Sequence, residues 1–307
     1  MPTKIEWTDE TWNPVRARLL ADPARVGWHC EHASAGCVFC YAERMNKRGI
    51  GTGLPYKPGH RKDIDIFLDE KVLERPLHWK RPRIIFPGSM TDLCADFVTD
   101  LMLDKIMAVA AATERHTYQF LTKRPERMLE YAGRAMGCGE HWLAHVERSH
   151  APMWPLPNVW LGTSVEDERV RGRIDVLRQV PAAVRFLSIE PLIGRLSNLD
   201  LTGIHWVIVG GESGPGARPM SVDWVREIRD ACEAQGVAFF FKQWGDWTHE
   251  ATAMKDAWPG RWHEFPREDS HLSAPVGCIR VGKKTAGRML DGRTHDAMPP
   301  PRVGAAW

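Results

Sequence analysis

The chain has 307 residues, of which 43% are hydrophobic, so a sizeable core can form. Its 41 Lys and Arg nearly balance its 39 Asp and Glu, which excludes binding to nucleic acid through bulk positive charge and confines any such contact to a local surface. Residues 1–13 lack the apolar run of a secretory signal, and no stretch of about 18 apolar residues could span a membrane, so we expect a cytoplasmic protein without membrane contact.

The first expected elements surround a cluster of three cysteines. Residues 5–16 predict a short strand, and residues 17–29 predict an irregular segment. Cys30, Cys37 and Cys40 follow with the spacing C-x6-C-x2-C, inside a loop that we place at residues 28–45. Helix-prone residues 41–48 come next, before a Gly- and Pro-rich loop and a short helix near residues 69–75.

From residue 83 onward, buried strands and amphipathic helices alternate. The expected strands are residues 83–89, 117–123, 158–165, 184–191, 205–212 and 237–245, and the expected helices are residues 98–114, 124–136, 166–179 and 221–235. This alternation predicts an α/β fold, a partial or full (β/α) barrel over residues 1–247. We interpret residues 136–157 as an insertion and residues 248–307 as an irregular extension packed on the barrel.

Three thiols this close together indicate a site for a metal or a cluster. Seven cysteines is an odd number, and three of them are too crowded for a disulfide framework. A structural zinc site normally takes four protein ligands, and His29 or His32 could supply the fourth. An iron–sulfur cluster held by three cysteines would leave one iron open for a small molecule. The residues alone leave both interpretations open.

The motif around the last two cysteines resembles a known loop. With Phe39 immediately before Cys40, it resembles the cluster loop of radical S-adenosylmethionine (SAM) enzymes, although most of that superfamily has three residues between the first two cysteines and this chain has six. The whole sequence resembles a family of phage and prophage proteins of unknown function that are radical-SAM-like and share the six-residue spacing. The matching stretches include IEWTDETWNPV, SAGCVFCYAERM, FPGSMTDL, FLTKRPERM, IVGGESGPGARPM and LDGRTHDAMP.

This resemblance implies a fold, two cofactors and an activity. The fold would be a barrel of the radical SAM type, with a [4Fe-4S] cluster on Cys30, Cys37 and Cys40 and S-adenosylmethionine on the open iron. One electron from a donor such as flavodoxin or ferredoxin would release a 5'-deoxyadenosyl radical that abstracts hydrogen from a substrate. The preferred substrate is a nucleobase in phage DNA, or a free nucleotide, in an infected or prophage-bearing bacterial cell; a small metabolite or a peptide is the alternative.

Polar or small residues close all six expected strands. In a parallel barrel, the loops at the carboxyl ends of the strands form the active site, and we assign candidate roles there. By the resemblance, the cofactor-binding residues are Phe39, Tyr41, Ser89, Asp92, Thr163, Ser164, Glu166, Ser188, Gly210, Gly211 and Glu212. The catalytic candidates are Glu190 and Lys242, and the substrate candidates are Lys123, Arg124, Gln243 and Trp244.

Two rival hypotheses remain from other functional classes. The first is a non-catalytic, zinc-stabilised module that binds nucleic acid. The second is a barrel that keeps a cluster only as a structural or sensing element. Helix caps, salt bridges and core packing are the structural alternatives for the polar strand ends.

Overall fold

A computed structural model describes residue 3 and residues 5–137, 154–249, 262–266 and 277–300. Most of the insertion expected at residues 136–157, and much of the expected extension after residue 248, therefore lie outside the described residues.

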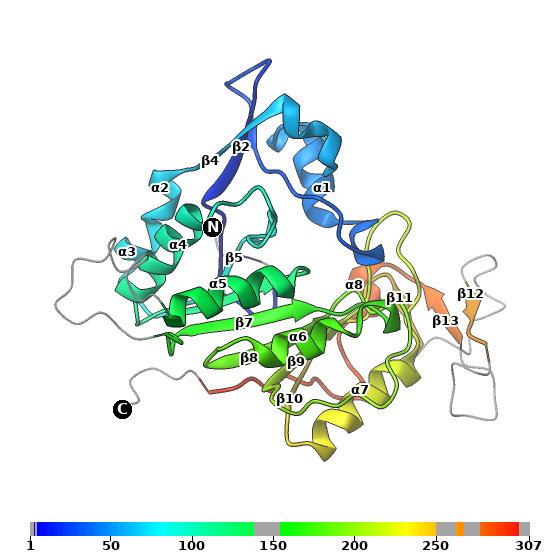
Figure 1. Cartoon of the computed structure of the whole chain (residues 1–307). Helices are drawn as coiled ribbons and strands as arrows, with labels where there is room; N and C mark the ends of the chain where they lie inside the picture. Colours follow the sequence, from blue (N-terminus) through cyan, green and yellow to red (C-terminus); the bar gives the residue numbers. More distant parts are fainter. Residues whose placement is uncertain (1–2, 4, 138–153, 250–261, 267–276, 301–307) are drawn as a thin grey trace. The chain divides into compact units, whose positions relative to one another are not determined.

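A seven-stranded sheet organises the chain (Figure 1). Its order is β1 (Glu10–Trp12), β5 (Ile84–Pro87), β6 (Thr117–Thr122), β7 (Val159–Ser164), β8 (Val184–Ile189), β9 (Trp206–Gly210) and β10 (Ala238–Gln243). Neighbouring strands run parallel, for example β5 with β6 and β9 with β10. Because strand order follows chain order without reversal, the fold is an α/β partial (β/α) barrel, and the predicted fold class is confirmed.

Helices separate most of the sheet strands along the chain, as predicted, whereas β8 and β9 are joined by residues 190–205 without a helix. These helices are α4 (Asp100–Ala112), α5 (Pro125–Gly137), α6 (Arg173–Gln179) and α7 (Val222–Ala234), with a 3₁₀ turn at Glu168–Val170 before α6. Two of the helices begin at a hydroxyl cap, because Thr99 accepts from the Met102 amide and Ser221 from the Asp223 amide. Contacts divide the chain into two compact units: Met1–Thr163, Gln179–Arg185 and Pro300–Trp307 form unit 1, and Ser164–Arg178 and Phe186–Pro299 form unit 2.

Unit 1 contains a small antiparallel sheet that the sequence did not predict. Its order is β3 (Val26–Gly27), β2 (Val15–Leu19) and β4 (Ile64–Leu68). The expectation of an irregular segment over residues 17–29 is therefore wrong at residues 17–19 and 26–27, which form strands, and confirmed at the residues between and after them. Val15 and Ala17 are buried while the residues between and after them are half-buried, so one face of β2 joins the core. The remaining short helices of this part are α1 (Tyr41–Met45), α2 (Glu70–Leu73) and α3 (Arg75–His78).

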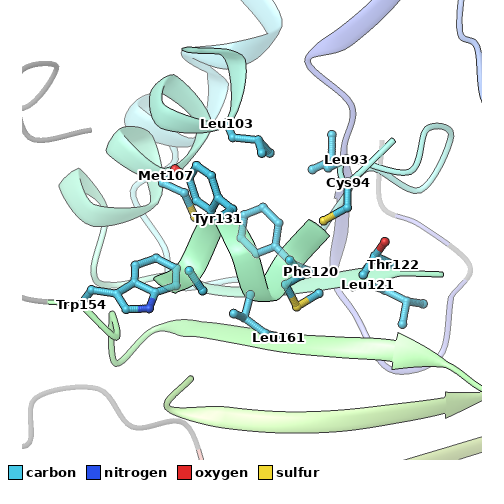
Figure 2. A pocket seen from close by; sticks show the side chains of 12 residues that line it. Leu93, Cys94, Leu103, Met107, Phe120, Leu121, Thr122, Tyr131, Trp154 and Leu161 are labelled. Atoms are coloured by element: carbon cyan, nitrogen blue, oxygen red, sulfur yellow. The ribbon is translucent and has the colours of Figure 1, made fainter. Parts of the chain in front are cut away.

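The core of unit 1 lies between the strands and the helices α4 and α5. A cavity of about 20 Å³ lies there. Figure 2 shows its lining, which includes the apolar side chains of Leu103, Met107, Phe120 and Trp154, with Cys94 and Thr122 at one side. This volume holds about one water molecule, and so the cavity is a packing void rather than a ligand pocket.

In unit 2, the chain after β10 is more regular than expected. The strands β11 (Trp247–Thr248), β13 (Gly277–Arg280) and β12 (Trp262–Glu264) form a second antiparallel sheet, followed by α8 (Lys283–Ala286). Later residues contact β10 and β9, because the Phe241 amide donates to the His295 carbonyl and the Trp206 indole donates to the Ala297 carbonyl. The described part of the extension thus contributes to the core of this unit.

Candidate functional site

The cysteine loop is built from two short helical turns in unit 1. Cys37 ends a 3₁₀ turn at Ala35–Cys37, and its amide donates to the Ser34 carbonyl at 3.0 Å. Cys40 caps the amino end of α1, where its carbonyl accepts from the Arg44 amide at 3.2 Å. A hydrogen bond from the Cys40 amide to the Cys37 carbonyl joins the two turns. The x2 spacing therefore places both thiols on one compact bend.

The three thiols form no disulfide, and neighbouring thiols affect one another's pKa. All three cysteines are unpaired, and Cys30 and Cys40 pack against the buried cluster of Ala42, Tyr56 and Met90. Burial raises the pKa of Cys30 to about 12, and the charges of Asp92 and Cys40 act in the same direction. Burial also raises the pKa of Cys40, with a further contribution from Cys37. The thiols therefore stay protonated unless a positively charged group offsets the cost of burying a thiolate.

Arg124, which follows β6, contacts both Asp92 and the cysteine loop. Arg124 Nη1 donates to Asp92 Oδ2 at 3.0 Å, and Arg124 Nη2 donates to the carbonyl of Glu31, the residue after Cys30, also at 3.0 Å. Asp92 also accepts from Thr122 Oγ1 at 2.6 Å and from the Lys123 amide at 3.0 Å. The predicted candidates Asp92 and Arg124 therefore meet, and together they anchor the loop at its first cysteine.

Both cations after β6 act on the cysteines. The positive charge of Arg124 lowers the pKa of Cys30, and that of Lys123 lowers the pKa of Cys40, against the larger effect of burial. Two residues predicted as substrate contacts thus provide positive charge that acts on the thiols. This charge favours the thiolate form that a metal or cluster requires.

Tyr41 and Ser89, both predicted to bind a cofactor, are also brought together. The Tyr41 hydroxyl donates to the Ser89 carbonyl at 2.8 Å, which fixes a ring that remains 45% exposed. Asn13 stabilises the turn at Ser89. Its Nδ2 donates to Ser89 Oγ, and its Oδ1 accepts from the Met90 amide at 2.9 Å. Thr163, on β7, donates its hydroxyl to the Thr122 carbonyl.

Asn46 and Glu43 organise the loop, and the sequence did not single them out. Asn46 is fully buried, and its Oδ1 accepts from the amides of Trp28 and Thr52 at 3.0 and 3.1 Å. Its Nδ2 donates to Thr52 Oγ1 and to the Leu54 carbonyl. Glu43 accepts from His32 Nε2 at 2.8 Å. A polar residue directly after the cysteine motif was the only hint that the sequence offered.

The two histidines of the zinc hypothesis already contact carboxylates. Nε2 of His29 lies 3.4 Å from Glu31, and Nε2 of His32 lies 2.8 Å from Glu43. His29 is buried against Phe97, at a ring distance of 5.2 Å, and burial lowers its pKa. Across the described residues, no group of three or more His, Cys, Asp or Glu side chains surrounds one point at the spacing of a metal site.

A separate polar cluster lies at the carboxyl ends of β8 and β10 in unit 2. Lys242 Nζ donates to both carboxylate oxygens of Glu190, at 2.8 and 2.9 Å. Gln243 Nε2 lies 3.3 Å from the same carboxylate, whereas Gln243 Oε1 is buried without a hydrogen-bond partner among the described residues. A buried acceptor of this kind can take a donor from a ligand or a water molecule. The structure thus groups the two catalytic candidates with one substrate candidate.

The other candidates of unit 2 serve its folded structure in this conformation. Glu212 binds Arg218 through both oxygens, and Glu166, which is 1% exposed, binds Arg173 at 3.1 Å. Trp244, predicted as a substrate contact, is only 1% exposed, and its indole donates to the Met289 carbonyl. The remaining candidates form hydrogen bonds through their backbone atoms. The carbonyls of Ser188, Ser164 and Gly210 accept from Val165, Arg173 and Leu192, respectively. The Gly211 amide donates to the Gln243 carbonyl.

A family model and a few solved structures match the chain. The model described as "Protein of unknown function (DUF5131)" matches residues 2–299. A cysteine-to-serine mutant of spore photoproduct lyase is similar with a TM-score of 0.42 and 11% identity, over 93% of this chain and 72% of that one. A spore photoproduct lyase variant with bound AdoMet and dinucleoside spore photoproduct has a TM-score of 0.39 and 11% identity, over 90% and 68%.

Structural similarity at these TM-scores and identities does not indicate a function, because one architecture can host many functions. No curated protein matches the sequence. No helix among the described residues is both long and apolar enough to cross a membrane. Since the family model spans nearly the whole chain, the protein belongs to the DUF5131 family.

Proposed function

We propose that this chain is a radical SAM enzyme whose [4Fe-4S] cluster is held by Cys30, Cys37 and Cys40. The observation that carries the proposal is a set of three free cysteines in one loop, of which Cys37 and Cys40 share one bend, while the charges of Arg124 and Lys123 act on Cys30 and Cys40. When bound, such a cluster supplies the electron that cleaves S-adenosylmethionine to a 5'-deoxyadenosyl radical, which takes hydrogen from the substrate. We further propose flavodoxin or ferredoxin as the electron donor.

The donor set fits a cluster chemically. In a four-iron cluster each thiolate binds a different iron, so its ligands do not crowd around one point as the ligands of a single ion do. The thiols of Cys30 and Cys40 carry a raised pKa, and the charge of a cluster would offset that cost together with the two cations. The x6 segment between Cys30 and Cys37 is held at its start, because Arg124 fixes the Glu31 carbonyl.

The residues around the loop then have defined tasks. Arg124 and Asp92 position the first cysteine, and Asn46 holds the chain before and after the loop together. The exposed ring of Tyr41 is oriented by Ser89 and offers a face for the adenine of the cofactor. The other cofactor-binding assignments, among them Phe39, Thr163 and Ser188, remain proposals on the same grounds.

For unit 2 we propose a role in substrate binding. Glu190 and Lys242 form a hydrogen-bonded ion pair, and the unpaired Gln243 Oε1 can accept from an amine or amide of the substrate. Such donors occur on the edges of nucleobases, so a base in DNA of an infected or prophage-bearing cell is the substrate that we propose. The reaction would take place in the cytoplasm.

The zinc-stabilised module is the second candidate function. It is favoured by His29 and His32, whose Nε2 contacts with carboxylates resemble those of zinc-bound histidines, which leave the other ring nitrogen for the metal. In that case the protein would bind nucleic acid without chemistry.

Anaerobic reconstitution with iron and sulfide separates these functions. We expect a brown protein that contains about four iron and four sulfide per chain and that releases 5'-deoxyadenosine from S-adenosylmethionine after reduction. Colourless protein with stoichiometric zinc and no cleavage would favour the zinc module, and colour without cleavage would favour a structural or sensing cluster.

The matched controls are cysteine variants of equal chemistry. Cys37→Ser should abolish colour and cleavage. Cys232 lies in α7, where its thiol is a buried apolar group. The folded fraction of Cys232→Ser should therefore keep both the colour and the cleavage activity. Equal loss in the two folded variants would contradict the assignment of the cluster to the loop.

A further inference from the structure

Positive charge is concentrated in the segment that carries the cysteine loop. Residues 15–68, from the start of β2 to the end of β4, contain nine Lys and Arg and five Asp and Glu, a net charge of +4, whereas the whole chain carries +2. The remainder of the chain is therefore slightly negative. A weakly charged protein thus presents a local basic segment, which is the arrangement that a polyanionic partner would need.

The acidic side chains of this segment are largely engaged within it. Asp65 pairs with Arg18 at 3.9 Å, and Asp63 pairs with His60 at 3.0 Å. Glu31 and Glu43 contact the two histidines of the cysteine loop. Five exposed cations have no carboxylate within 4.0 Å among the described residues: Arg25, Arg48, Lys57, Arg61 and Lys62.

The fold gathers four of these cations at one end of the small sheet. Lys57, Arg61 and Lys62 belong to or adjoin the 3₁₀ helix Pro58–Asp63, which leads directly into β4. The turn between β2 and β3 lies beside them, because the Leu20 amide donates to the Asp63 carbonyl at 3.0 Å. Arg25 follows that turn. We call Arg25, Lys57, Arg61 and Lys62 the basic face.

The basic face is connected to the cysteine loop through two ring contacts. The Arg61 guanidinium lies over Phe97, at 5.0 Å from the ring centre. The ring of Phe97 lies 5.2 Å from the ring of His29, which precedes Cys30. The side chains of Phe97 and His29 therefore link Arg61 of the basic face to the residue before Cys30.

Exposed apolar side chains accompany the charge. Leu20 and Ile50 are 57% and 56% exposed, and Val38 and Tyr41 are 54% and 45% exposed on the loop itself. Cations that follow a backbone, next to apolar and aromatic side chains that bases can contact, are typical of proteins that bind single-stranded nucleic acid.

We infer that the basic face binds the phosphate backbone of single-stranded DNA and presents it to the cysteine loop. The biological meaning of this surface rests on the proposed function, since it would deliver a base to the reaction. Binding itself needs neither the cluster nor S-adenosylmethionine. The two proposals can therefore fail independently.

The test is fluorescence anisotropy of a labelled 20-nucleotide single strand with the full chain at 50 and 200 mM salt. Four phosphate contacts predict a logarithmic salt slope of about −3, so the affinity should fall about 50-fold over this range. In the double variant Lys57→Glu/Lys62→Glu, affinity should fall about tenfold or more and the slope should become shallower. Lys80→Glu makes the same charge change at an exposed site outside the segment and should bind like the wild type.

Circular dichroism and thermal melting establish that the variants fold. Absence of binding at 50 mM salt, or equal binding by the double variant and the wild type, would overturn the inference. Tighter binding to RNA of the same sequence would overturn the assignment to DNA, and preferential competition by polyglutamate would indicate an acidic protein partner instead. Retained binding by Cys37→Ser, with cofactor cleavage lost, is the result expected if both proposals hold.

Discussion

Replacing Arg124 by Gln should release the cysteine loop from the barrel strand. The guanidinium joins Asp92 and the Glu31 carbonyl with two hydrogen bonds of 3.0 Å, and the two charged side chains are only 19% and 9% exposed. Loss of a buried ion pair costs about 3–5 kcal/mol when one charge is left unpaired. Asp92 keeps its contacts with Thr122 and the Lys123 amide, so we expect about 2–3 kcal/mol here.

Two measurements test this value. The melting temperature should fall by about 3–5 °C, and the buried Cys30 thiol should react faster with a thiol reagent. Arg134→Gln is the control, because Arg134 pairs with Asp100 while 49% exposed and should cost less than about 1 kcal/mol without a change in thiol reactivity.

A double-mutant cycle isolates the interaction. Asp92→Asn combined with Arg124→Gln should be less destabilising than the sum of the single changes, with a coupling free energy of about 1 kcal/mol or more. Additive effects, together with unchanged reactivity of Cys30, would refute the role of this ion pair in holding the loop.

Three further predictions follow from the contacts. Asn46→Ala removes four buried hydrogen bonds and should cost about 3 kcal/mol in urea unfolding; a loss below about 1 kcal/mol would mean that water replaces the amide. In Gly211→Ala the new Cβ would lie 2.0 Å from the backbone oxygen of Trp244, whereas in Gly210→Ala it meets only a side chain at 3.1 Å, so the first should lower the melting temperature much more; equal shifts would contradict this. Two arginines of α7 lower the pKa of Asp291 from 3.8 to about 2. This carboxylate therefore stabilises the fold above about pH 4, and the contribution is lost as the pH falls toward 2. Asp291→Asn should flatten the pH dependence of the unfolding free energy in that window, and an unchanged profile would argue against this role of Asp291.

The order of the main sheet could be predicted because each strand carries its own pattern. Residues 117–123 and 237–245 are short apolar runs closed by polar residues, and the structure places β6 and β10 inside them. Parallel strands buried on both faces need such continuous apolar runs, and their right-handed connections follow from chain chirality. The C-x6-C-x2-C motif is equally local, so its thiols could be predicted as a candidate site without knowledge of the fold.

Contacts between distant segments could not be predicted in this way. The strands β2 and β4 are separated by more than forty residues and are stabilised by pairing with each other, so residues 17–29 carried no pattern strong enough to reveal a strand. The same holds for Asn46, whose partners lie on both sides of the cysteine loop, and for Trp244, whose burial depends on Met289.

The sequence was sufficient to predict a candidate chemistry, because three cysteines within eleven residues and polar strand ends are local features. The contacts that each polar residue makes depend on the folded chain. Arg124 was expected to face a substrate, but it holds Asp92 and the Glu31 carbonyl, because folding brings the end of β6 to the cysteine loop. Hydrogen bonds and burial depend on neighbours in space, and only the folded chain defines those neighbours.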